Sequence, residues 1–361
     1  MSGLSILEIL SVITAFQLLM LGLVLISMKS IRRQSNRILS LFMFCNALVM
    51  IHFLLSLTST LSLPNIYVFY YLLAPLLYIY TRSMCFKDFR LKPVYFLHGA
   101  IFAVTLLYVA FRMLFMEDAM EKWDFYEYII SSVVLHVQIA LYVIASLISI
   151  YRYRREIKNI YSAVERINLS WLLFIIFAFA TMWFTDFIGF ILDAFSINLG
   201  GTNIYLLVVS VSINLVFANY LVYKGLRQAD AFSGLMDREK YSSSKIPDEE
   251  SSKIVKRLKE AMQREKPYLN ADLSIKDLSE HINIHPKFLS QIINSQFDQN
   301  FFDFVNFYRI EEAKHIIRNN TDEKMTILEI LYEVGFNSKS AFNNAFKKNT
   351  GMTPSEFKRT G

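Results

Sequence analysis

One side of a predicted helix near the C-terminus gathers side chains that form hydrogen bonds and ion pairs. The six polar residues of this face are Lys339, Ser340, Asn343, Asn344, Lys347 and Lys348. Amide and ammonium groups in such a row suit the base edges and the phosphates of DNA. Phe342 and Phe346 lie on the opposite face, so the helix can bury that side. The pattern predicts a helix that lies in a groove of DNA.

A shorter helix and a tight turn precede this face and are expected to position it. Thr326 can cap the shorter helix, and Glu329 three residues later closes a capping box. Ile330 and Val334 share its apolar face at helical spacing. Gly335 then ends the helix, because a residue without a Cβ takes the left-handed conformation at little cost. The two helices and their turn have the layout of a helix-turn-helix.

The run from Gly335 to Pro354 is more specific than a pair of amphipathic helices. It contains Gly-Phe, then Ser-Lys-Ser-Ala-Phe, Ala-Phe-Lys-Lys and finally Gly-Met-Thr-Pro-Ser-Glu-Phe. This run resembles the signature of the AraC family of bacterial transcription regulators, and the resemblance covers roughly Tyr268 to Arg359. It implies a helical DNA-binding domain with two helix-turn-helix units, in which one chain covers two turns of DNA.

An earlier version of the same pattern agrees with that implication. Ser274 and Asn283 each lie 52 residues before their counterparts, Thr326 and Gly335. Between the two units, residues 301–319 form a predicted helix about 28 Å long. Successive major grooves on one face of DNA lie about 34–36 Å apart. A rigid spacer of this length can hold two reading helices in adjacent grooves.

The resemblance also implies which side chains contact DNA. Base contacts fall on Lys287, Ser290, Gln291, Lys339, Ser340, Asn343 and Asn344. Phosphate contacts, which give affinity without sequence information, fall on Asn294, Lys347 and Lys348. Considered without the resemblance, the same residues are solvated faces of two helices. The first unit departs from the family pattern at His285, where Ser or Thr is the stronger helix cap.

The rest of the chain is too apolar for an ordinary soluble protein. Hydrophobic residues make up 54% of the 361, and the mean hydropathy is +0.35. Residues 1–223 hold 15 Lys and Arg and 11 Asp and Glu, whereas residues 224–361 hold 22 and 20. The charges are therefore concentrated in the C-terminal part, which indicates a membrane region followed by a soluble one.

Seven apolar stretches are expected to cross a bilayer, which takes about 20 residues each. They are Leu4–Met28, Ile38–Leu63, Ile66–Thr81, Pro93–Met116, Tyr128–Ile150, Leu169–Leu192 and Ile204–Tyr223. The first lacks the basic start and the cleavage site of a signal peptide, so we expect a retained helix. The predicted fold is all-α: a seven-helix membrane bundle in residues 1–223, a linker and connecting helix in 224–265, and a DNA-binding domain in 266–361.

The loops between these spans differ in their content of lysine and arginine. The first, third and fifth loops carry four, four and five of them, whereas the second and sixth carry none and the fourth carries one. By the positive-inside rule the odd loops are cytoplasmic. The N-terminus is then outside, and the C-terminal domain lies in the cytoplasm. The expected location is the inner (cytoplasmic) membrane of a bacterial cell, where the protein contacts both the lipid bilayer and promoter DNA.

Ionisable side chains within the spans are costly in hydrocarbon and usually face the bundle interior. His52, Arg112, His136 and Asp186 are predicted to lie in the outer half or the middle of the bundle. They form a candidate pocket for an unknown small-molecule or protein signal. The alternative is a set of satisfied hydrogen bonds between helices. The histidines and cysteines show no metal-ligand spacing, so neither a metal nor another cofactor is expected.

The leading interpretation is a membrane-embedded, sequence-specific DNA-binding transcription regulator that couples an external or membrane signal to gene expression. A helix expected over Ser251–Glu265 would pass on the signal or pair with a second copy, and the sequence leaves the oligomeric state open. The alternative is a membrane receptor or transporter whose C-terminal domain is a protein-interaction module. An enzyme is not expected, because there is no Gly-rich phosphate loop, kinase set or nucleophile elbow.

Overall fold

A computed structural model describes residues 3–27, 33–58, 68–86, 89–115, 125–165, 167–197, 202–227, 248–319 and 325–360. Every regular element within these ranges is a helix, and the one β contact is an isolated bridge between Tyr161 and Ser274. The chain divides into two compact units. The first unit comprises residues 1–151 and 169–236, and the second comprises residues 152–168 and 237–361.

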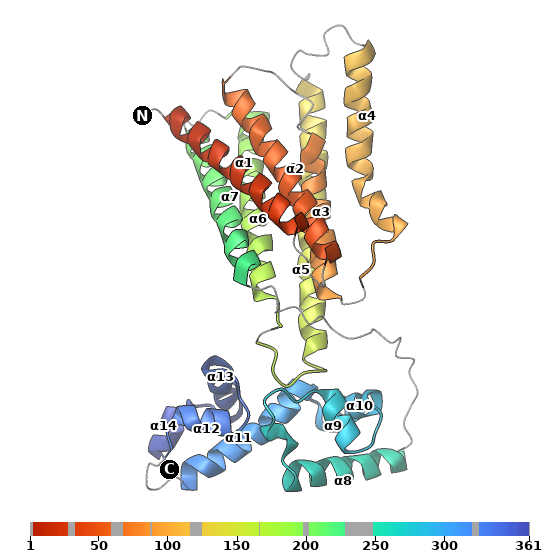
Figure 1. The fold of residues 1–361 in the computed structure, drawn as a ribbon, viewed down its shortest axis with the longest axis vertical. Helices are drawn as coiled ribbons and strands as arrows, with labels where there is room; N and C mark the ends of the chain where they lie inside the picture. Colours follow the sequence, from red (N-terminus) through yellow and green to blue (C-terminus); the bar gives the residue numbers. More distant parts are fainter. Residues whose placement is uncertain are drawn as a thin grey trace. The chain divides into compact units, whose positions relative to one another are not determined.

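The first unit is a bundle of long apolar helices (Figure 1). They are α1 (Gly3–Ser27), α2 (Arg33–Thr58), α3 (Tyr70–Cys85), η2 (Pro93–Gly99), α4 (Ala100–Phe115), α5 (Phe125–Ile157), α6 (Ser170–Ala194) and α7 (Thr202–Arg227). Among the described residues, five helical stretches are long and apolar enough to cross a membrane: those of α1, α2, η2–α4, α5 and α6. α3 has 16 residues, and the apolar described part of α7 spans Tyr205–Tyr220. Several apolar helices are thus present, while the number seven stays a prediction.

Hydrogen bonds join helices of this bundle at polar side chains. Asn46 of α2 and Asn214 of α7 form a reciprocal amide pair, with nitrogen-to-oxygen distances of 3.2 and 3.3 Å. Ser40 of α2 donates to the carbonyl oxygen of Gly22 in α1 at 2.7 Å. Such bonds satisfy polar groups that would be costly in an apolar interior.

The second unit consists of short helices arranged along one longer helix (Figure 1). They are α8 (Asp248–Arg264), η3 (Pro267–Leu269), α9 (Ile275–His281), α10 (Pro286–Phe297), α11 (Phe301–Asn319), α12 (Ile327–Glu333), α13 (Lys339–Thr350) and α14 (Pro354–Thr360). The capping boxes predicted at Ser274 and Thr326 are both present. The left-handed turns predicted after α9 and α12 are also confirmed, with φ of +52° at Asn283 and +86° at Gly335.

Two hydrophobic cores lie at the two ends of α11. The first joins α8, α9 and α10 to the N-terminal half of α11 through residues such as Met262, Leu289 and Phe304. The second joins α12 and α13 to its C-terminal half through residues such as Leu331 and Phe342. α8 therefore packs inside the first core, because Leu258, Ala261 and Met262 are buried there.

Candidate nucleic-acid interface

α13 exposes the polar face that the sequence predicts for DNA. Ser338 caps the helix, since its hydroxyl oxygen accepts from the amide of Ala341 at 3.2 Å. Phe342 and Phe346 are fully buried beneath it. The exposed members of the polar face are Lys339, Ser340, Asn344, Lys347 and Lys348, and Asn343 is half-buried. The amphipathic pattern thus turns the predicted contact residues outward.

α10 also has a cap and a polar face, but fewer of its predicted contact residues are exposed than on α13. The cap predicted to be poor is formed, because Nδ1 of His285 accepts from the amide of Lys287 at 3.2 Å. Gln291 is exposed, whereas Lys287 and Ser290 are half-buried. Asn294 is exposed, but its amide nitrogen already donates to the carbonyl oxygen of Ser290 at 2.7 Å.

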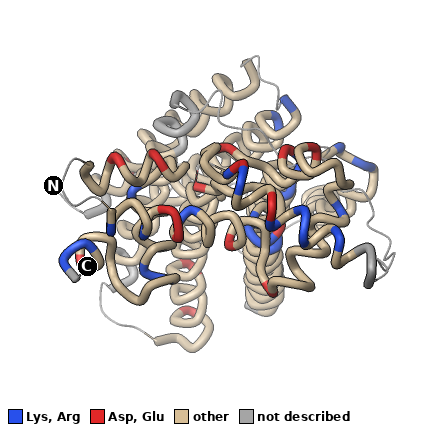
Figure 2. Tube along the Cα trace, turned by 90° about the horizontal axis from the view of Figure 1, so that it is seen from below, with Lys and Arg blue, Asp and Glu red and all other residues tan. Residues whose placement is uncertain are grey.

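Lys348 has an acidic partner within the same unit. Its Nζ lies 2.7 Å from Oδ1 of Asp303 in α11. To contact a phosphate, Lys348 would have to break this ion pair with Asp303. Among the described residues, Lys347 forms no such ion pair. Basic and acidic positions are interspersed along the trace (Figure 2), and residues 224–361 carry a net charge of only +2. Affinity for DNA therefore depends on local placement of cations more than on bulk charge.

The turn between α12 and α13 is pressed against the segment that follows α8. A Cβ built on Gly335 would lie 2.7 Å from the carbonyl oxygens of both Tyr268 and Leu269. Asn337, in the same turn, donates to Oδ1 of Asp272 at 3.2 Å. Residues 268–272 thus position the start of α13 from a distance of more than 60 residues along the chain.

Arg309 lies in the middle of α11 and is 1% exposed. Its Nε donates to the carbonyl oxygen of Tyr268 and its Nη2 to that of Asn270, each at 2.7 Å. Its guanidinium carbon also lies 5.5 Å from the ring centre of Phe336, next to Gly335. Burial lowers the pKa of Arg309 to about 10, although Glu165 and Asp272 oppose this shift. A charge at this depth is tolerable because five donors meet several fixed acceptors.

The loop between α5 and α6 belongs to this second unit, which the sequence did not reveal. Ser162 accepts from Arg309 through both its carbonyl oxygen (3.3 Å) and its hydroxyl oxygen (3.1 Å). The carbonyl oxygen of Ile160 accepts from the amide of Ile275 at 2.8 Å, and that of Lys158 accepts from the amide of Phe302 at 2.9 Å. These two amides lie in the first turns of α9 and α11, where a backbone amide has no acceptor within its own helix. The loop therefore completes both helix ends.

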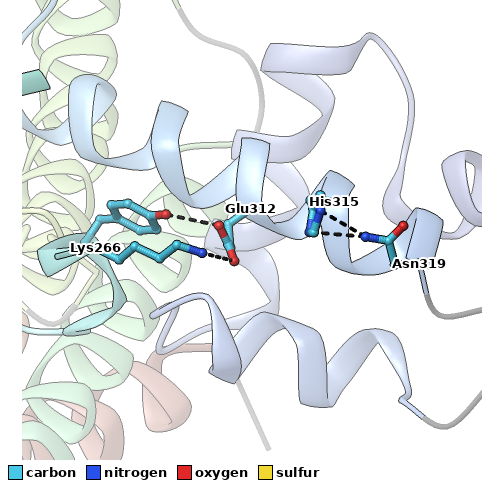
Figure 3. Close-up of polar contacts among 5 residues, drawn as sticks. Lys266, Glu312, His315 and Asn319 are labelled. Atoms are coloured by element: carbon cyan, nitrogen blue, oxygen red, sulfur yellow. Dashed lines mark hydrogen bonds and ion pairs between the residues drawn. The ribbon is translucent and has the colours of Figure 1, made fainter. Parts of the chain in front are cut away.

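Glu312 forms a second polar link on α11, shown in Figure 3. Its carboxylate accepts from Nζ of Lys266 at 2.7 Å and from the hydroxyl of Tyr268 at 3.1 Å. Farther along the helix, Asn319 donates to the ring of His315 (Figure 3). Burial alone would raise the pKa of Glu312, but the hydrogen bonds from Lys266 and Tyr268 outweigh it and lower the pKa.

The lowered pKa of Glu312 predicts a loss of stability in acid. The unfolded chain takes up the proton first as the pH falls, so the stabilisation is present above about pH 4.3, the ordinary pKa of glutamate. It is lost as the pH falls through the lower value of the folded state. Hydrogen exchange of α11 amides across this range should therefore show falling protection in the natural chain. In Glu312→Gln the contribution should be absent at neutral pH, and an unchanged acid profile would contradict the assignment.

Of the four residues predicted for the signal pocket, the structure places two in one cavity. His136 and Asp186 line one cavity together, and His52 and Arg112 are not among its lining residues. Arg112 instead pairs with Glu127, with Nη1 and Oε2 2.7 Å apart. The residue types identified these ionisable groups in the sequence. The rotation of each helix about its axis decides which side chains face the same cavity, and residue types do not determine that rotation.

The two helix pairs around α11, with the exposed polar face of α13, have the layout of a helix-turn-helix DNA-binding domain at the C-terminus. Residues 278–360 match the family described as "Helix-turn-helix domain". A relative from Pseudoalteromonas carrageenovora, an HTH-type transcriptional regulator in the cgkA 5′ region, is 46% identical over 52 residues, which is 14% of this chain and 28% of the relative. The transcriptional regulatory protein YesN of Bacillus subtilis is 32% identical over 92 residues, which is 25% of this chain and 24% of the relative.

Among solved structures, the C-terminal domain of AraT, a response regulator from Geobacillus stearothermophilus, is 29% identical. The alignment covers 30% of this chain and 85% of that one, with a TM-score of 0.27. The chain thus spans about a quarter of the length of the two curated relatives described above. The similarity lies in the DNA-binding domain, and these relatives are transcriptional regulators by name.

Proposed function

We propose that the chain is a membrane-embedded, sequence-specific transcription regulator of a bacterial cytoplasmic membrane, whose DNA-binding domain lies on the cytoplasmic side. The observation that carries this proposal is the exposed polar face of α13, held by its cap and by the buried Phe342 and Phe346 within an AraC-type domain. Lys339, Ser340, Asn343 and Asn344 are the base contacts of the second unit. Lysine suits guanine, and asparagine suits adenine.

α10 is the second reading helix in this proposal, with Lys287, Ser290 and Gln291 at base edges. α11 separates the two helix pairs and carries both hydrophobic cores, so the pairs are held apart by one rigid element. Asn294, Lys347 and Lys348 face phosphates. Lys347 is the stronger of these contacts, because Lys348 must first leave Asp303.

Substitutions on α13 separate sequence reading from general affinity. The full-length protein in lipid nanodiscs is first used to select its preferred DNA from a random pool. Asn344→Ala is expected to cost about 1–3 kcal/mol on the selected site and to relax preference at one base pair. Lys347→Ala is the matched control: it should weaken selected and random DNA alike and reduce the salt dependence by about one ion. Selection of no common sequence would refute sequence-specific binding and favour a protein-interaction module.

Membrane embedding is supported by a large apolar surface whose exposure to water would be unfavourable. Leu107 and Leu114 of α4 are 71% and 75% exposed, and Val109 is the one buried residue of that helix. An apolar helix with so little protein cover needs lipid or another apolar partner. Thiol labelling of single cysteines placed in the predicted second and fifth loops of intact cells tests the topology. Labelling of the fifth-loop cysteine from outside would overturn the proposed orientation.

Signal transfer is proposed to run through the end of α5 and the loop that follows it, residues 152–168, which belong to the second unit. This loop is continuous with α5 and α6, while its middle caps α9 and α11 and accepts from Arg309. A signal that alters the ends of α5 and α6 would thereby bias the DNA-binding domain between two states, as coupling requires. α8 is built into the first core and moves with the domain.

Ser162→Ala tests this route, because it removes the hydroxyl that accepts from Arg309 and that donates, beside the backbone amide of Ser162, to the carbonyl oxygen of Leu273. A loss of about 1 kcal/mol in local stability is expected from one buried hydrogen bond. In cells, the variant should change basal expression from a reporter that carries the selected DNA site. Thr326→Ala, at the cap of α12, touches neither the loop nor the polar face of α13 and provides a control of comparable cost. Unchanged reporter output in Ser162→Ala at equal protein level would argue against this route.

A further inference from the structure

A cavity of about 450 Å³ lies within the first unit, between α2, α3, α5, α6 and α7. Its size falls in the range of small-molecule sites. Asn46 and Asn214, which hydrogen-bond to each other, lie in its wall, and so do His136 and Asp186. A molecule in this space would contact five helices at once. It would therefore be well placed to change how they pack.

The charge of the lining is negative. Asp186 and Asp193 both line the cavity, and none of the described residues that line it is lysine or arginine. Asp186 accepts one hydrogen bond, from the hydroxyl of Ser210 at 3.2 Å. A neutral hydroxyl orients a carboxylate but leaves its charge in place. Within an apolar bundle, such a charge is stabilised by water or by a cation that enters the cavity.

His136 does not supply that cation. Nε1 of Trp183 donates to Nδ1 of His136 at 3.0 Å. Because the indole nitrogen is a donor only, Nδ1 must act as the acceptor, and the imidazole is then neutral with its proton on Nε2. The hydrogen bond from Trp183 thus keeps His136, the one basic side chain among the described lining residues, uncharged.

Aromatic rings line the same cavity as Asp186. The cavity is lined by Phe53, Tyr70, Tyr128, Phe179, Trp183 and Phe190. Ring faces attract ammonium groups, most strongly when water is excluded, and cages of aromatic rings are a recurrent arrangement for quaternary ammonium ligands. A small inorganic ion would leave most of this space unfilled, whereas an organic cation can fill it with an apolar body.

We propose that this cavity binds a small organic cation, with Asp186 as its counter-ion and the surrounding rings as its apolar and cation–π contacts. This inference rests on the proposed membrane placement and names the ligand class of the proposed signal site. It does not depend on how the second unit binds DNA.

Binding is measured on the full-length protein in nanodiscs of zwitterionic lipid, by calorimetry and by quenching of tryptophan fluorescence. The probes are benzyltrimethylammonium and choline, whose charge does not vary with pH, and benzenesulfonate as an anion of similar bulk. Both cations should bind the natural protein more tightly than the anion. Asp186→Asn should weaken the preferred cation at least tenfold. Ser210→Ala lines the same cavity and keeps the charge, so it should change the affinity less than threefold.

Equal affinity of the cations for the natural protein and Asp186→Asn, including no measurable binding to either, overturns the proposal, as does tighter binding of the anion. Equal losses in both variants would also overturn it, because they would point to general disturbance of the cavity. The same samples are tested for binding to the selected DNA. Intact DNA binding without a cation effect refutes the ligand class alone, while cation binding without DNA binding refutes the regulator function alone.

Discussion

Replacement of Arg309 by methionine is expected to lower the free energy of unfolding of the second unit by about 2–5 kcal/mol. Methionine has a similar volume, so the loss comes mainly from unpaired acceptors and not from a cavity. The carbonyl oxygens of Tyr268 and Ser162 would stay buried without the donor that now serves them, whereas that of Asn270 keeps the amide of Leu273. Hydrogen exchange of the full-length protein, followed by mass spectrometry of peptides from residues 268–319, measures this loss.

Arg309→Lys and Arg318→Met separate the causes. Lysine keeps the charge but not the planar fork, so it should recover only part of the stability. Arg318 is exposed on the same helix, and its replacement should cost less than about 1 kcal/mol. A double variant with Ser162→Ala should be less destabilised than the sum of the two, because the Ser162 hydroxyl loses its partner in either case. Strict additivity would show that Arg309 and the loop act independently.

Local signals explain why the DNA-binding domain could be predicted from the sequence. The helix expected over residues 301–319 has those bounds as α11, and the boxes at Ser274 and Thr326 form as predicted. Each of these features depends on side chains within four residues of one another. The outward side of α13 follows in the same way, since a buried Phe342 fixes which side of the helix faces outward. The DNA contacts assigned to that side stay a prediction.

Contacts between distant segments could not be predicted in this way. Ser162 and Arg309 are 147 residues apart in the sequence. The fifth loop has no periodic pattern that would predict its contacts with α9 and α11. One signal was nevertheless present in α11. Phe301, Val305 and Ala313 mark a buried stripe at intervals of four residues, and Arg309 occupies the missing position. A charged residue in a core stripe predicts a fixed set of acceptors, but it cannot say which segment supplies them.

Position 335, in the turn before α13, should not accept any side chain without a loss of stability. Gly335→Ala is expected to destabilise the second helix pair by about 2–4 kcal/mol, through left-handed strain and through steric overlap. The overlap is with backbone, since the new Cβ would lie 2.7 Å from two carbonyl oxygens of residues 268 and 269. The carbonyl oxygen of Tyr268 cannot easily rotate away, because it is held by Arg309. Loss of hydrogen-exchange protection in α12 and α13 is the measurement.

Gly351→Ala distinguishes the two causes, because it shares the backbone conformation without the crowding. Its φ is +81°, close to the +86° of Gly335, yet a Cβ there would have no heavy atom within 4 Å. It should therefore cost only the conformational strain, about 1–2 kcal/mol. The excess at Gly335 measures how closely the turn is pressed against residues 268–269. If the two variants lose equal stability, the packing of this turn is looser than the structure indicates, and α13 is positioned by its own core alone.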